Sequence, residues 1–103
     1  MPVVIFTVKT NAYVTVLYYR ESNGDRIRIE LNGGVGRKDF PAGSDQVASL
    51  FLHGSLNSTA DFTIEQEAAS GNILLAERPG IVVTDESGIT VEVPFRVADP
   101  ACT

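Results

Sequence analysis

Hydrophobic and polar residues alternate along most of this chain, and Gly, Asn, Ser and Pro interrupt the alternation at short intervals. Alternation with a period of two places successive side chains on opposite faces of a β-strand. Long windows show no helical spacing of apolar residues. The pattern therefore predicts about eight short strands, at residues 3–9, 12–20, 26–31, 46–53, 61–67, 73–77, 81–84 and 89–97, with a short helix as the alternative at 46–53.

Strands of this number, separated by turn signals about every 8–12 residues, are typical of a β-sandwich or barrel. We expect one all-β domain over residues 1–103, an antiparallel β-sandwich of about 7–8 short strands. The strand count and spacing resemble immunoglobulin- and fibronectin-type sandwiches, without the Cys–Trp–Cys signature of true immunoglobulin domains.

Asn23-Gly24 lies between two of the expected strands and fits a two-residue type I′ turn, which needs positive φ at both central positions. Such a turn would pair Tyr19 with Arg28 and Tyr18 with Ile29. One face of this hairpin is then expected in the core: Val14, Val16, Tyr18, Ile27, Ile29 and Leu31. The other face is expected to be exposed: Tyr13, Thr15, Leu17, Tyr19, Glu21, Arg26, Arg28 and Glu30.

The same alternation assigns inward-facing residues in three other strands. The expected core residues there are Val4, Phe6 and Val8, then Phe62 and Ile64, then Ile89, Val91, Val93, Phe95 and Val97. Pro94 has no N–H to donate to a sheet ladder, so we expect the last strand to be an edge strand or to carry a bulge.

The exposed hairpin face is the first candidate binding site, formed by Tyr13, Leu17, Tyr19 and Arg28. Tyr and Arg are enriched at interface hot spots. We expect a non-catalytic interaction or assembly module that binds protein partners or its own copies. Two alternatives are open: a carbohydrate-binding module whose tyrosines stack on sugar rings, and a face covered by residues 32–45 of the same chain.

Residues 32–38 are expected to form a glycine-rich loop, in which Arg37 and Lys38 are further binding candidates for an anion or a partner. Gly33-Gly34-Val35-Gly36 and Arg78-Pro79 resemble loop motifs of one family of cysteine-protease inhibitors. That resemblance implies a third possible role, an enzyme inhibitor that acts through this loop.

The charge balance argues against two classes of partner. Eight basic and thirteen acidic residues give a net charge of −5. Nucleic-acid affinity depends largely on Lys and Arg that neutralise phosphates, and anionic membranes attract basic segments. We therefore expect no nucleic-acid partner. No apolar run approaches the ~20 residues of a membrane-spanning helix, so we also expect no membrane insertion.

Candidate chemistry for catalysis or cofactors is sparse. His53 is the only histidine and no nucleophile motif accompanies it, so we expect neither an enzyme nor a cofactor. One His, one Cys and one Met are too few for a zinc or copper site. Calcium at turn carboxylates such as Asp85 and Glu86 stays open, and so does the role of the lone Cys102.

The first residues show no signal-peptide pattern. We expect a cytoplasmic or virion protein if Met1 is the native start, and a secreted or periplasmic one if the chain is a mature domain.

Overall fold

The computed structural model describes residues 2–21 and 24–99. Within them the chain forms antiparallel strands and no helix, which confirms the predicted all-β class. The strands are β1 (Val3–Thr10), β2 (Val14–Glu21), β3 (Ile27–Ile29), β4 (Val35–Asp39), β5 (Asp45–His53), β6 (Thr59–Gln66), β7 (Ile73–Val82) and β8 (Ile89–Arg96).

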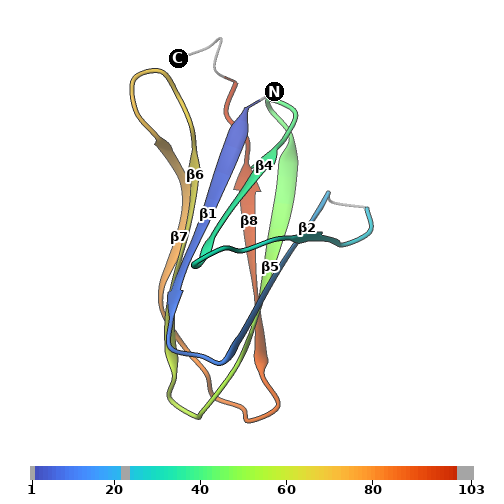
Figure 1. Cartoon of the computed structure of the whole chain (residues 1–103). Coiled ribbons are helices and arrows are strands. Elements are labelled where there is room, and N and C mark those ends of the chain that lie inside the picture. The colour runs from blue at the N-terminus through green and yellow to red at the C-terminus, as the bar shows by residue number, and fades with distance from the viewer. Residues whose placement is uncertain (1, 22–23, 100–103) are drawn as a thin grey trace.

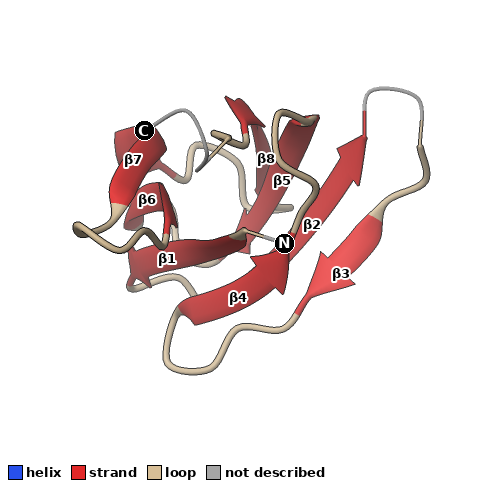
Figure 2. Ribbon diagram, turned by 90° about the horizontal axis from the view of Figure 1, so that it is seen from above, coloured by secondary structure: helices blue, strands red, loops and turns tan. Residues whose placement is uncertain are grey.

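The strands form two four-stranded sheets in a sandwich-like arrangement. One sheet has the order β4-β1-β6-β7 and the other the order β3-β2-β5-β8. Figure 2, seen from above, separates the two layers, and Figure 1 shows β1, β5, β6, β7 and β8 running along the length of the molecule. β8 stands at one end of its sheet, where Pro94 faces Val47 of β5.

The core lies between the sheets and follows the predicted alternation in three strands. Val4, Phe6 and Val8 of β1 are buried, as are Phe62 and Ile64 of β6, which confirms both predicted sets. Val93, Phe95 and Val97 are buried too, while Ile89 and Val91 are half-buried against the core. Period-two patterning alone is enough to place these side chains.

Phe40, which follows β4, joins the two sheets at one end of the core. Its ring centroid lies 6.1 Å from that of Phe6 and 5.6 Å from that of Phe95, both in edge-to-face geometry. Such aromatic pairs add stability beyond the apolar area they bury. Gln66 is fully buried at the same end and exchanges two hydrogen bonds with the backbone of Ala98, so its amide is satisfied.

The predicted hairpin register is wrong by one residue. Tyr19 pairs with Ile27, Tyr18 with Arg28, and Leu17 with Ile29. Because side chains alternate between faces, this shift exchanges the inner and outer sets of β2, whereas in β3 Ile29 is buried and Arg28 exposed as predicted. The predicted turn residue Asn23 lies outside the described residues.

Two further sequence predictions need correction. The pattern predicts separate strands at residues 73–77 and 81–84, but β7 runs continuously from Ile73 to Val82 through Pro79 and Gly80. The composition of residues 32–38 predicts a loop, but Val35–Asp39 form strand β4. The chain reverses instead at Gly33-Gly34, where both residues have positive φ and Asn32 and Val35 exchange backbone hydrogen bonds.

No helix in the part of the chain that the structure describes is long and apolar enough to cross a membrane.

Candidate functional site

The proposed exposed face of Tyr13, Leu17, Tyr19 and Arg28 does not exist as predicted. Leu17 is completely buried in the core. Tyr19 is half-buried and packs edge-to-face on Phe40, with 4.9 Å between ring centroids. The register shift explains both positions, because it turns the odd-numbered residues of β2 toward the opposite sheet.

Tyr13 and Arg28 are exposed, as predicted, but at different places. Tyr13 precedes β2, is 77% exposed, and its hydroxyl lies 2.8 Å from Ser55 Oγ. Arg28 lies on the short edge strand β3, opposite Tyr18. The structure therefore does not bring these two residues together with Leu17 and Tyr19 into one surface.

Arg37 and Lys38 lie in β4 rather than in a loop, and their side chains have separate surroundings. Arg37 Nη1 donates to Glu67 Oε1 at 2.6 Å, next to β6. Lys38 Nζ lies 5.5 Å from the centre of the Tyr19 ring, within cation–π range. Lys38 thus lies against the half-buried Tyr19 ring, whereas Arg37 lies on the outer surface of its sheet.

The outer surface of the β3-β2-β5-β8 sheet forms the most distinctive surface of the described chain. The register places its side chains in cross-strand rows. The first row is Val16, Phe51 and Thr90; the second is Arg28, Tyr18, Ser49 and Glu92; the third is Arg20, Val47 and Pro94. We call these residues together the Tyr18–Phe51 face.

A shallow hollow of about 340 Å³ occupies the middle of the Tyr18–Phe51 face. Val16, Tyr18 and Phe51 supply its apolar walls, and Arg26 and Thr90 line its rim. Ser49 also lines it, is only 2% exposed, and its hydroxyl has no hydrogen-bond partner. A buried hydroxyl without a partner is costly, and because neighbouring side chains cover this one, a ligand reaches it only if those side chains move.

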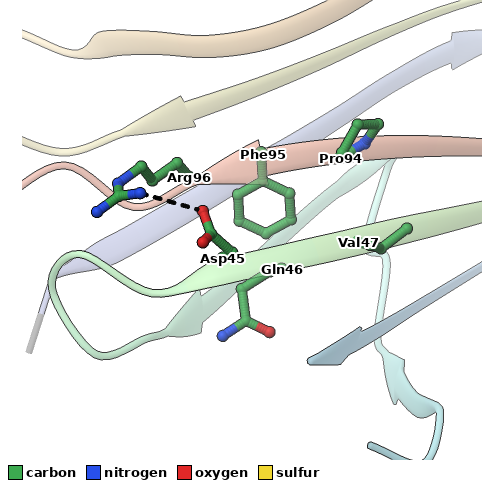
Figure 3. A pocket seen from close by; sticks show the side chains of 6 residues that line it. All are labelled: Asp45, Gln46, Val47, Pro94, Phe95 and Arg96. Atoms are coloured by element: carbon green, nitrogen blue, oxygen red, sulfur yellow. Dashed lines mark ion pairs between the residues drawn. The ribbon is translucent and has the colours of Figure 1, made fainter. Parts of the chain in front are cut away.

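A second hollow of about 340 Å³ lies between β5 and β8, where Val47 and Pro94 of the third row and the neighbouring Asp45 and Arg96 line it. Figure 3 shows Arg96 reaching across to Asp45, 3.6 Å away, while Val47 and Pro94 stand side by side on the two strands. Apolar side chains therefore extend from the central hollow to this end of the sheet.

The charges on the Tyr18–Phe51 face are concentrated in arginines and one carboxylate. Arg20 Nη2 donates to Glu92 Oε2 at 3.2 Å across β5. Arg28 and Arg26 are exposed on the β3 side and make no ion pair with any described residue. The β3 side of the face therefore carries two arginines, with the exposed carboxylates Asp25 and Glu30 in the residues that flank β3, and Glu92 lies on the β8 side.

The outer surface of the opposite sheet has a different character. Around Thr7 and Thr63 it carries the charged residues Lys9, Arg37, Asp61, Glu65, Glu67 and Glu77, together with the exposed apolar side chains Val35 and Leu74. Only the β3-β2-β5-β8 sheet, among the described residues, presents aromatic rings in the middle of its outer surface. The two sides of the molecule are thus chemically distinct.

The turn between β7 and β8 contains the acidic residues considered for calcium. Both the hydroxyl and the backbone N–H of Ser87 donate to Asp85 Oδ1, at 2.7 and 2.9 Å. Both hydrogen bonds hold the pKa of Asp85 below its ordinary value, and the bond from the Ser87 hydroxyl has the larger effect. Residues 2–21 and 24–99 hold no group of three or more His, Cys, Asp or Glu side chains placed to bind a metal.

Sequence reasoning missed Phe51, Val47 and Ser49 as members of a surface. The signal was present in the run Val47–Leu52, where apolar residues occupy both parities of one strand. Such a strand contacts apolar surroundings on both faces.

Comparison of the chain with protein-family models, with curated proteins and with solved structures finds no match. The resemblance of its strand spacing to immunoglobulin- and fibronectin-type sandwiches therefore stays a prediction.

Proposed function

We propose that this chain is a non-catalytic interaction module that binds protein through the Tyr18–Phe51 face. The observation that carries the proposal is the hollow lined by Val16, Tyr18 and Phe51 over the unpartnered Ser49 hydroxyl. Exposed apolar patches rimmed by polar groups are typical of protein interaction sites. Tyr and Arg, which surround this hollow, are the residue types most enriched at binding hot spots.

The non-catalytic part of the proposal rests on the chemistry around the hollow. Ser49 supplies its one buried hydroxyl, and no base accepts the proton of that group. His53 lies at the end of β5, opposite Val14, two rows away from Ser49. Acyl or phosphoryl transfer needs a nucleophile within hydrogen-bond reach of its base.

Photocrosslinking tests the docking surface. p-Benzoylphenylalanine in place of Phe51 should give covalent adducts with protein when the chain is expressed in its own cells. The matched control is the same group in place of Thr63, at the centre of the opposite outer surface. Adducts from position 51 alone support the proposal, provided that Val16→Asp removes them. Equal yields at both positions, or no adduct at 51, contradict it.

A carbohydrate ligand is the second candidate, favoured by the diagonal placement of Tyr18 and Phe51 on neighbouring strands. Aromatic rings on an open sheet face can stack on sugar rings, and Ser49 and Thr90 supply hydroxyl groups beside them. A glycan array probed with the wild-type chain and with Tyr18→Ala distinguishes the two functions. Hits that Tyr18→Ala abolishes favour the sugar, and an array without hits removes this candidate.

A further inference from the structure

The second row of the Tyr18–Phe51 face has a self-complementary order. From β3 to β8 it reads Arg28, Tyr18, Ser49, Glu92. An arginine without a described ion-pair partner stands at one end and a carboxylate at the other. Glu92 is 48% exposed and uses one carboxylate oxygen for Arg20, so its other oxygen is open to a second cation.

We propose that the occupant of this face is a second copy of the same chain. The two copies are related by a two-fold axis that lies between their stacked sheets, parallel to the strands and over the line between β2 and β5. This inference rests on the proposed function, since it uses the same docking surface. Rotation by half a turn about that axis stacks the two sheets face to face and exchanges their edges. β3 of each copy then covers β8 of the other, and β2 covers β5.

This arrangement matches the side chains row by row. Arg28 of each copy lies over Glu92 of the other, which pairs opposite charges twice. Tyr18 lies over Ser49, so the large ring of one copy stands over the smallest side chain of the row in the other. Val16 lies over Phe51, which buries apolar surface on both sides. An isologous interface requires such reciprocal contacts.

The charge pattern also distinguishes the two extreme directions of such an axis, along the strands and perpendicular to them. A two-fold axis perpendicular to the strands would stack β3 on β3 and β8 on β8. Arg28 of one copy would then face the strand that carries Arg28 in the second copy, and the two Glu92 strands would face each other in the same way. Like charges that face each other across an interface oppose binding. The axis along the strands is the one that avoids this repulsion.

The size of the face sets the expected strength of the dimer. Strands β2, β5 and β8 have 8, 9 and 8 residues and β3 has 3. At about 3.3 Å per residue and about 4.8 Å between strands, the face covers roughly 450 Å². Two such faces bury roughly 900 Å², below the range of stable specific interfaces. The net charge of −5 on each copy also opposes association. We therefore expect a weak dimer with a dissociation constant in the micromolar to submillimolar range.

Sedimentation equilibrium from about 5 µM to about 1 mM protein measures this association. Salt at physiological ionic strength screens the net charge, and a reductant keeps Cys102, which lies outside the described residues, from forming disulfides. We expect a monomer–dimer equilibrium for the wild-type chain. A chain that stays monomeric at about 1 mM overturns the dimer, while the crosslink from position 51 decides separately whether the face binds protein at all.

Charge reversal tests the axis. Arg28→Glu places two carboxylates at each end of the stacked row, and Glu92→Arg places two arginines there. Each variant alone should dimerise at least about tenfold more weakly than the wild type. An equimolar mixture of the two should regain association as a heterodimer. In that mixed pair the new carboxylate at position 28 faces the new guanidinium at position 92, and the native Glu92 of the first chain faces the native Arg28 of the second.

Matched variants on the opposite sheet control for net charge. Lys9→Glu and Glu65→Arg change the charge in the same directions as charge reversal at 28 and 92 but lie on the other outer surface. Both should keep wild-type association, and melting curves check that every variant is folded. A mixture that associates no better than its components overturns the proposed axis. If Phe51→Arg nevertheless abolishes the association that the wild-type chain shows, the face is the docking surface and only the proposed direction of the axis is wrong.

Discussion

Leu17 and Val16 are neighbours on β2 with opposite surroundings. Leu17 is fully buried opposite Ile29, whereas Val16 lies on the outer surface. Leu17→Ala should lower the free energy of unfolding by about 2–5 kcal/mol, because it removes buried apolar atoms and leaves a cavity. Val16→Ala should lower it by less than about 1 kcal/mol. Urea denaturation of both variants measures the difference, and the reverse ranking would restore the register expected from the Asn23-Gly24 turn.

Asp85 gives a single-residue prediction for pH dependence. Its pKa is lowered from 3.8, first by the hydrogen bond from the Ser87 hydroxyl and then by that from the Ser87 N–H. A lowered pKa in the folded state means that the ionised carboxylate stabilises the fold. This contribution is fully present above the ordinary pKa and is lost as the pH falls below 3.8 through the folded-state pKa.

NMR titration of the Asp85 side-chain carboxyl measures that pKa directly. Ser87→Ala removes the hydroxyl donor and keeps the backbone N–H, so the pKa should rise part of the way toward its ordinary value. The acid-unfolding midpoint should move in the same direction. An unchanged Asp85 titration in Ser87→Ala would show that the hydroxyl is not the cause.

Among the elements, the turn at Gly33-Gly34 places β4 beside β1. Both glycines have positive φ, at 62° and 82°, but only Gly34 lies against another backbone, where an added Cβ would collide with the Val8 carbonyl oxygen. Gly34 O also accepts the Val8 N–H at 2.7 Å. The two positions therefore share a left-handed backbone conformation that would strain any other residue, and they differ in the room around them.

Alanine substitutions at the two glycines separate these effects. Gly33→Ala should cost about 1 kcal/mol of stability, since it adds the strain of a positive φ in open space. Gly34→Ala should cost more, because the Val8 carbonyl must also move and its ladder with β4 is disturbed. Thermal unfolding of both variants ranks them. Equal costs would mean that the close approach to Val8 does not constrain the turn.

The hairpin between β2 and β3 shows why element positions are easier to predict than registers. Asn-Gly marks a chain reversal, but it does not by itself fix the number of loop residues. A two-residue loop is favoured by its twist, yet longer loops are also common. Here a register shift of one residue places Leu17 and Tyr19 in the core. The strands were therefore predictable, whereas the exposed face depended on a loop length that the pattern leaves open.

Long-range contacts explain why β4 and β7 differ from the elements that the sequence pattern predicts. β4 is rich in polar residues and has no strong strand pattern, and it becomes a strand because β1 offers it a free edge. β7 passes through Pro79 and Gly80 because these residues lie on an edge, where a missing N–H and a positive φ are tolerated. Tertiary context decides such segments more than local propensity does.

At the scale of the whole molecule, the two sheets combine one shared core with two unlike outer surfaces. The charged surface around Thr63 favours solvent, and the Tyr18–Phe51 face offers apolar side chains between arginines. Pro79 on β7 and Pro94 on β8 each remove a donor from a strand at the end of its sheet, which discourages the sheets from extending edge to edge. Association through a face rather than an edge is the route this architecture favours.

Amide hydrogen exchange tests that architecture as a whole. β1 and β6 in one sheet, and β2 and β5 in the other, have paired neighbours on both sides, so their amides should exchange most slowly. The edge strands β3, β4, β7 and β8 should exchange faster, with the three-residue β3 among the fastest. Stacking of two faces forms no new ladder hydrogen bonds, so this ranking should persist at high protein concentration. Selective slowing of β7 or β8 amides at high concentration would instead indicate pairing through an edge, and the face would then not be the surface that assembles the protein.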